Sequence, residues 1–96
     1  MDINTTTYTK KRNRAAALAT YDPNNLLDVL LEMLQVKNDL ILSRMLDVPA
    51  PSISRIRHHK LAVGASMLIR MHEISGLSIN RLRVLMGDHR DKFYGK

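Results

Sequence analysis

The chain has 96 residues, enough for a single domain or for one domain with an arm. Hydrophobic residues make up 45% of it, so the composition is that of a globular protein and not of a disordered one. The absence of cysteine excludes disulfides, thiolate metal sites and cysteine nucleophiles. The formal net charge of +6 favours an anionic partner. Nucleic acid is the first candidate, and an acidic membrane surface is the less frequent one.

Residues 1–21 contain four basic residues and no sustained helical spacing of apolar residues, which predicts a flexible basic arm. The basic residues are Lys10, Lys11, Arg12 and Arg14. A folded domain is expected over residues 22–87, followed by a charged tail over residues 88–96. The apolar run over residues 15–19, which follows these basic residues within the arm, is shorter than the roughly 7–15 residues of an export signal. No segment approaches the about 20 residues of a membrane span. We therefore expect a cytoplasmic protein that does not contact a membrane.

The first helix of the domain is expected to begin at Asp22 as N-cap, with Pro23 in its first turn. Helical spacing predicts an inner face made of Leu26, Leu30, Met33 and Leu34. Leu27 and Leu31 widen the apolar side beyond what one core contact needs. This surplus indicates a surface for a partner.

Two short helices follow. One is expected to begin after Asn38 or Asp39 and to stop before Val48–Pro49, because the residue before a proline disfavours helical backbone. The next is expected from about residue 50 to residues 58–60, with Ile53 and Ile56 turned inward at a spacing of i and i+3.

The last two helices are bounded by glycine and serine. A helix over residues 65–75 is expected to end at Gly76 as its C-cap, and another to begin at Ser78 and to stop at Gly87. No segment has the alternating pattern of a strand, so the fold class is expected to be all-α.

The segment over residues 42–56 has the layout of a helix-turn-helix, in which a tight turn joins two short helices. It resembles the helix-turn-helix of the lambda-repressor/Cro-type, also called the XRE-type, and the likeness extends over about residues 24–87. The residues that match that family's pattern are Leu42, Leu46, Val48, Ile53, Ser54 and Ile56. The resemblance implies a compact five-helix DNA-binding domain whose third helix lies in the major groove.

The chain departs from the family pattern at several positions. Asp47 stands where the family has a turn glycine, so it is expected to adopt a left-handed backbone. Arg57 replaces a glutamate that is charge-paired in the family, so Arg57 is not expected to inherit that role and is expected to face a phosphate. Asp39 stands where many members have a phosphate-contacting glutamine, for which the amide of Asn38 is a substitute.

The resemblance, together with side-chain chemistry, assigns four base contacts at the third helix: Ala50, Pro51, Ser52 and Arg55. Ala50 and Pro51 offer only apolar contact, for example to a thymine methyl group. Ser52 is expected to hydrogen-bond a base or a phosphate, or to cap the helix. Arg55 matches guanine, because a guanidinium donates to O6 and N7 together.

Phosphate contacts are expected from a second group of polar residues, which set affinity and orientation but not sequence preference. They are Asn38, Arg44, Ser54, Arg57, His58, His59 and Lys60. The basic residues of the arm are expected in the minor groove or along the backbone of the DNA. Neighbouring histidines on a helix point about 100° apart, so no metal site is expected, and no cofactor is indicated.

The leading hypothesis is a sequence-specific transcriptional regulator of bacterial or phage origin, associated with the nucleoid. It is expected to bind an inverted repeat of double-stranded DNA as a homodimer and to act as a repressor. Candidates for the dimer surface are the acidic first helix, the fifth helix and the tail. The fifth helix and the tail are preferred, through Val84, Leu85, Phe93 and Tyr94. One alternative is an antitoxin or adaptor that binds another protein through Leu27 and Leu31.

A further alternative is an architectural protein that binds DNA by charge alone, without sequence preference. An enzyme is not expected, because the chain has no glycine-rich phosphate loop, no metal-ligand cluster and no pairing of nucleophile and base.

Overall fold

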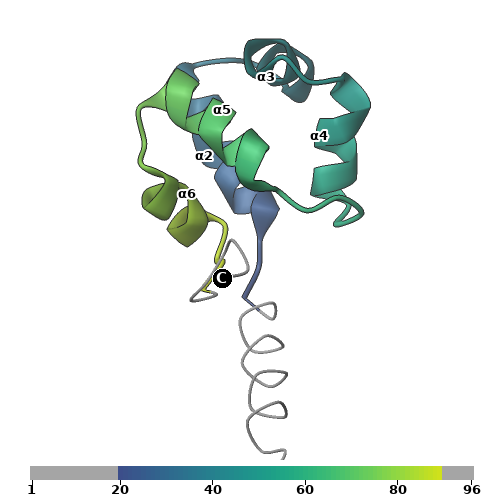
Figure 1. Cartoon of the computed structure of the whole chain (residues 1–96). Helices are drawn as coiled ribbons and strands as arrows, with labels where there is room; N and C mark the ends of the chain where they lie inside the picture. The colour runs from purple at the N-terminus through teal and green to yellow at the C-terminus, as the bar shows by residue number, and fades with distance from the viewer. Residues whose placement is uncertain (1–19, 90–96) are drawn as a thin grey trace, which may run out of the picture.

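Five α-helices and no strand make up residues 20–89, the part of the chain that the computed structural model describes (Figure 1). They are α2 (Pro23–Leu34), α3 (Asp39–Leu46), α4 (Ala50–Arg57), α5 (Ala65–Ser75) and α6 (Ile79–Leu85). The expected all-α class is confirmed for these residues. The basic residues predicted to form the arm lie outside them, as does most of the C-terminal tail.

The helix ends follow the capping signals of the sequence. The side chains of Asp22, Asn38 and Ser78 each accept a hydrogen bond from a backbone N–H three residues further on, so they are the N-caps of α2, α3 and α6. Gly76 ends α5 with a φ of 79°, in the left-handed region where a glycine is unstrained. The sequence predicted these helix ends because each depends on residues that are close in sequence.

The turn between α3 and α4 also has the expected backbone. Asp47 has a φ of 58° and a ψ of 47°, which confirms the left-handed conformation predicted at this position. Pro49 is the N-cap residue of α4, and within residues 20–89 no side chain caps this helix. The capping role considered for Ser52 is therefore not observed.

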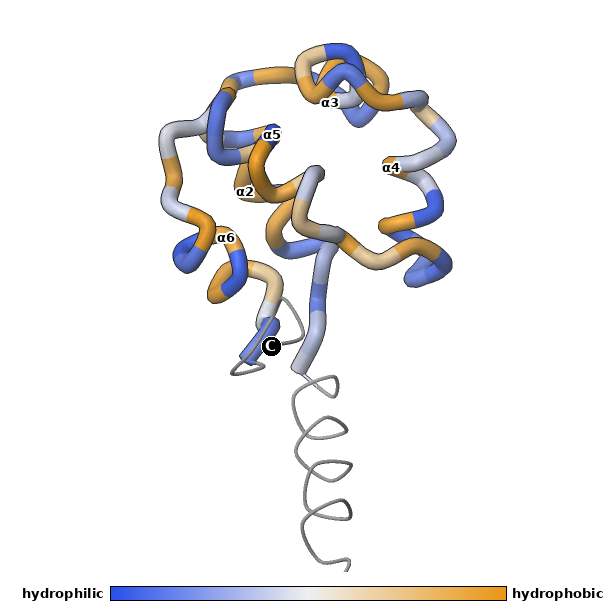
Figure 2. Tube along the Cα trace, viewed as in Figure 1, coloured by the Kyte–Doolittle hydropathy of each residue, from blue (hydrophilic) through white to orange (hydrophobic). Residues whose placement is uncertain are grey.

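The core lies where α2 contacts α4, α5 and α6, and where α3 contacts α4 and α5. Figure 2 shows hydrophobic stretches on every helix, interrupted by hydrophilic ones, as amphipathic helices require. Two expectations for α2 are wrong. Leu27, expected on a partner surface, is 0% exposed in the core, and Leu31 packs against that core, whereas Met33, expected inside, is 46% exposed.

Hydrogen bonds join the beginning of the described chain to the end of α6. The Thr20 hydroxyl donates to the Gly87 carbonyl at 2.7 Å, and the Asp22 backbone N–H donates to the Met86 carbonyl at 2.7 Å. Asp88, only 5% exposed, continues the fold past the predicted boundary at residue 87. The folded unit therefore extends by one or two residues beyond the predicted range at each end.

Gly87 is required by both its conformation and its surroundings. Its φ is 69°, and a Cβ atom at this position would overlap the Thr20 carbonyl. Gly76 has a similar φ of 79°, but a Cβ there would meet nothing within 4 Å. The two glycines thus form a matched pair that separates backbone strain from steric overlap.

We expect Gly76→Ala to lower the free energy of unfolding by about 1–2 kcal/mol, the cost of a left-handed non-glycine residue. Gly87→Ala should lower the free energy of unfolding by about 1–3 kcal/mol more than Gly76→Ala does, because the Thr20 backbone must also be displaced. Urea denaturation of both variants tests this. Equal losses in the two variants would contradict the close approach of Thr20 to Gly87.

Candidate nucleic-acid interface

One side of α4 is exposed along its whole length, and we call it the outward face. It consists of Ala50, Pro51, Ser54, Arg55 and His58. At about 100° per residue these positions cover about 140° of the helix, and the position of His58 lies near the middle. The opposite side holds Ile53 and Ile56, both 0% exposed, which anchor the helix in the core as predicted.

The two serines of α4 lie differently from the expected arrangement. Ser52, expected to contact a base, is half-buried, and at about 100° per residue its position lies about 60° outside the outward face. Ser54, expected to contact a phosphate, is exposed on the outward face next to Arg55. The structure therefore brings Ser54, and not Ser52, together with the expected base contacts.

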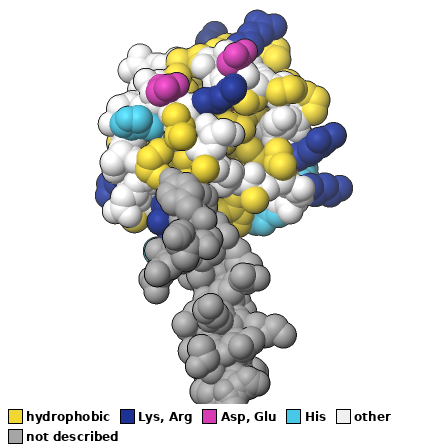
Figure 3. All heavy atoms as spheres, in the orientation of Figure 1, with side chains coloured by type: hydrophobic (Ala, Val, Ile, Leu, Met, Phe, Trp, Pro, Cys, Tyr) yellow, Lys and Arg dark blue, Asp and Glu magenta, His cyan; other side chains and the backbone are white. Residues whose placement is uncertain are grey.

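Further basic groups flank the outward face. Arg44 is exposed on α3, and His59 and Lys60 are exposed in the turn after α4. Figure 3 shows Lys and Arg side chains gathered along the α4 edge and above α3. The Asn38 side-chain oxygen accepts a hydrogen bond from the backbone N–H of Ile41, and the donor of this side chain is its amide nitrogen.

Arg57 joins α4 to α2 and α3 through a network of charged hydrogen bonds. Its Nε and Nη2 donate to the two carboxylate oxygens of Asp39, at 2.8 Å and 2.9 Å. Its Nη1 donates to Asp28 Oδ1 at 2.8 Å and to Asn24 Oδ1 at 3.0 Å. The amide of Asn24 in turn donates to the Arg57 carbonyl at 3.0 Å. One guanidinium thus contacts three side chains on two other helices.

The expectation that Arg57 has no charge-paired role is wrong. It keeps such a role with the opposite sign of charge, because Asp39 and Asp28 supply the carboxylates. The Arg57 side chain is 22% exposed, and its bidentate bond to Asp39 raises the pKa of the guanidinium, although partial burial opposes this. A phosphate would have to compete with two carboxylates already in place.

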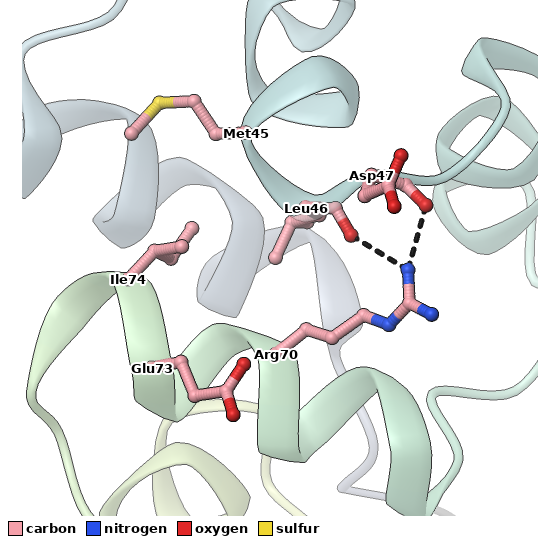
Figure 4. A pocket seen from close by; sticks show the side chains of 6 residues that line it. All are labelled: Met45, Leu46, Asp47, Arg70, Glu73 and Ile74. Carbon is pink, nitrogen blue, oxygen red and sulfur yellow. Dashed lines mark hydrogen bonds between the residues drawn. The ribbon is translucent and has the colours of Figure 1, made fainter.

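A second arginine holds the turn of the helix-turn-helix. Nη1 of Arg70, on α5, donates to the carbonyl oxygens of Leu46 at 2.9 Å and Asp47 at 2.6 Å (Figure 4). These carbonyls lie at the end of α3, where the last helical acceptors have no partner within the helix. Arg70 therefore fixes the start of the connection to α4 from the outside, beside a shallow pocket that includes Met45 and Ile74.

The chain enters the domain close to the end of α4. The Tyr21 hydroxyl accepts a hydrogen bond from the Val63 backbone N–H at 3.2 Å. Its ring lies edge-on to the ring of His59, with centroids 6.2 Å apart. Tyr21 therefore joins the start of the described chain to the turn after α4.

Within residues 20–89 no group of three or more His, Asp or Glu side chains is placed to hold a metal ion. None of the helices in the same range has the length and hydropathy needed to cross a bilayer.

Comparison of the chain with protein-family models, with curated proteins and with solved structures gives no match in any of the three. The resemblance to the lambda-repressor/Cro-type domains therefore depends on the residues of the helix-turn-helix segment alone.

Sequence reasoning missed both arginine contacts. The partners of Arg57 are 18 and 29 residues away, and those of Arg70 are backbone carbonyls that no side-chain pattern indicates. The one available signal was charge: α2 and the start of α3 are acidic, and an arginine lies on the inner edge of α4. Such complementarity becomes specific only once the helices are placed.

We expect Arg57→Leu to lower the free energy of unfolding by about 1–2 kcal/mol, because the half-buried carboxylate of Asp39 loses its bidentate partner, while the exposed Asp28 adds little. Arg55→Leu, on the exposed side of the same helix, should change it by less than about 0.5 kcal/mol. Chemical denaturation of both variants measures the difference. A similar small effect for both would show that the Arg57 network contributes little to stability.

Proposed function

We propose that this chain is a sequence-specific DNA-binding transcriptional regulator with a lambda-repressor-like fold. The observation that carries the proposal is the outward face of α4. It is exposed from Ala50 to His58, while the other side is fixed by Ile53 and Ile56 in the core. A short helix held at one side and open at the other is what insertion into a major groove requires.

Within this proposal the two arginines of α4 have different tasks. Arg55 contacts a base, because it is exposed on the outward face and its guanidinium matches guanine. Arg57 positions α4 on α2 and α3, so we remove it from the proposed phosphate contacts. Arg44, Lys60 and the amide of Asn38 remain the proposed phosphate contacts around the helix.

We further propose that the protein is a cytoplasmic repressor that binds an inverted repeat as a homodimer, since two-fold protein symmetry matches two half-sites. Val84 on α6 is 48% exposed, which supports the predicted place of the dimer surface, whereas Leu85 is half-buried against the core. Phe93 and Tyr94 lie outside the described residues.

The adaptor hypothesis loses the feature that suggested it. It relied on an exposed face formed by Leu27 and Leu31, and the structure packs both residues on the core. Binding by charge alone remains an outcome of the experiment that follows.

The proposed function is tested by selecting duplexes from a random DNA pool at about 150 mM salt, where non-specific phosphate binding is weak. We expect an enriched inverted repeat. Enrichment of no sequence, combined with binding that weakens steeply as salt rises, would overturn the proposal in favour of an architectural protein.

Arg55→Ala should relax the preference at one base pair in each half-site by about fivefold to a hundredfold, which corresponds to about 1–3 kcal/mol. Arg44→Ala, a proposed phosphate contact, should weaken binding to all sequences alike and reduce the salt dependence. Repeating the selection and a salt titration with both variants separates the two roles. An unchanged sequence preference in Arg55→Ala would remove the proposed base contact.

For the dimer, we expect Val84→Glu to lower the dimer fraction in sedimentation equilibrium, because a charge would be buried in the contact. Ile69→Glu is the matched control, since Ile69 is 49% exposed on α5. Dissociation by Ile69→Glu alone would move the dimer surface from α6 to α5.

A further inference from the structure

His58 is the C-cap residue of α4, so it lies at the C-terminal end of the outward face and, at about 100° per residue, near the middle of its width. Its predicted role was a phosphate contact. Its side chain is exposed and points away from the core residues Ile53 and Ile56. Ala50 and Ser54 precede it by eight and four residues, so the three lie in one row along α4. A helix that enters a groove by this face therefore brings His58 toward the bases.

The imidazole of His58 has a defined orientation. Its Nδ1 lies 2.8 Å from the Ser54 carbonyl oxygen, one helical turn back. A carbonyl oxygen only accepts hydrogen bonds, so Nδ1 must carry the proton. In the neutral ring, Nε2 is then the acceptor, and it is not engaged by the Ser54 carbonyl.

This tautomer changes which group His58 can bind. A neutral ring with its proton engaged at Ser54 has no donor to offer a phosphate oxygen, which itself only accepts. An acceptor in the major groove instead matches the amino group N4 of cytosine or N6 of adenine. Guanine, which presents only the acceptors O6 and N7 on its major-groove edge, does not match.

We propose that His58 is a second base-contacting residue, whose Nε2 accepts a hydrogen bond from the amino group of a cytosine or an adenine. The inference rests on the proposed function and specifies which side chains of the outward face determine the sequence preference. Residues three apart on a helix are separated by about 4.5 Å along its axis, close to the 3.4 Å step between base pairs. The contacted base pair is therefore adjacent to the one contacted by Arg55.

The experiment compares selections from a random duplex pool at pH 8, where imidazole side chains are normally neutral. The wild-type chain should select cytosine or adenine next to the base pair that Arg55→Ala relaxes. His58→Ala should reduce that preference about fivefold, the effect of one hydrogen bond. His58→Lys, which offers donors and no acceptor, should shift the preference to guanine.

His59→Asn is the matched control. His59 is exposed, but it lies beyond the end of α4 with a φ of 60°, a backbone that asparagine tolerates, and its ring faces Tyr21. We expect no change of base preference in this variant. Thermal denaturation followed by circular dichroism shows whether each variant remains folded at the temperature of the selection.

The tautomer has a readout that needs no DNA. Long-range ¹H–¹⁵N spectra of the free protein at pH 8 should show His58 protonated at Nδ1. A ring protonated at Nε2, or identical preferences of wild type, His58→Ala and His58→Lys for an enriched motif, would overturn the inference and leave the proposed function standing. Enrichment of no motif by the wild-type chain would overturn both.

Discussion

The contact between Arg57 and its two carboxylates decides where α4 lies. Helices α3 and α4 have eight residues each, which is too short for a helix to be stable alone in water. Ile53 and Ile56 anchor α4 by apolar burial, which is non-directional and leaves rotation about the helix axis weakly defined. The bidentate bond to Asp39 and the bond to Asp28 are directional, so they set that rotation and with it the direction of the outward face.

The sign of the charge in this network matters less than its geometry. The matching position in the family that the chain resembles has a glutamate, and here an arginine occupies it with aspartates opposite. A guanidinium has five donors in a planar fork, so it can bind carboxylates on two helices at once. Arg70 adds a similar contact from α5 to the end of α3. Directional contacts therefore join α3 to α4 through Asp39 and Arg57, and hold this pair from α2 and from α5.

The sequence predicted what depends on neighbouring residues. Asp22, Asn38 and Ser78 cap helices by bonds to backbone groups three residues away, and Asp47 adopts its left-handed backbone within a single turn. Leu27 and Met33 were misplaced because α2 is apolar on more than one side. Which side is buried depends on where α4, α5 and α6 pack, and periodicity within α2 does not contain that information. The same holds for the site. Helical spacing in the sequence predicted that Arg55 is exposed, whereas the tautomer of His58 follows from the distance between its Nδ1 and the Ser54 carbonyl oxygen.

The hydrogen bonds between the first described residues and the end of α6 have a consequence for how the domain opens. Chain ends usually fray independently, because each loses only its own local contacts. Here the Thr20 hydroxyl and the Asp22 N–H are satisfied by the carbonyls of Gly87 and Met86, so releasing either end breaks the bonds of the other. The first and the last described residues lie at the same end of the domain (Figure 1). Tension applied at either end of the described chain is therefore resisted by these hydrogen bonds before it reaches α3 and α4.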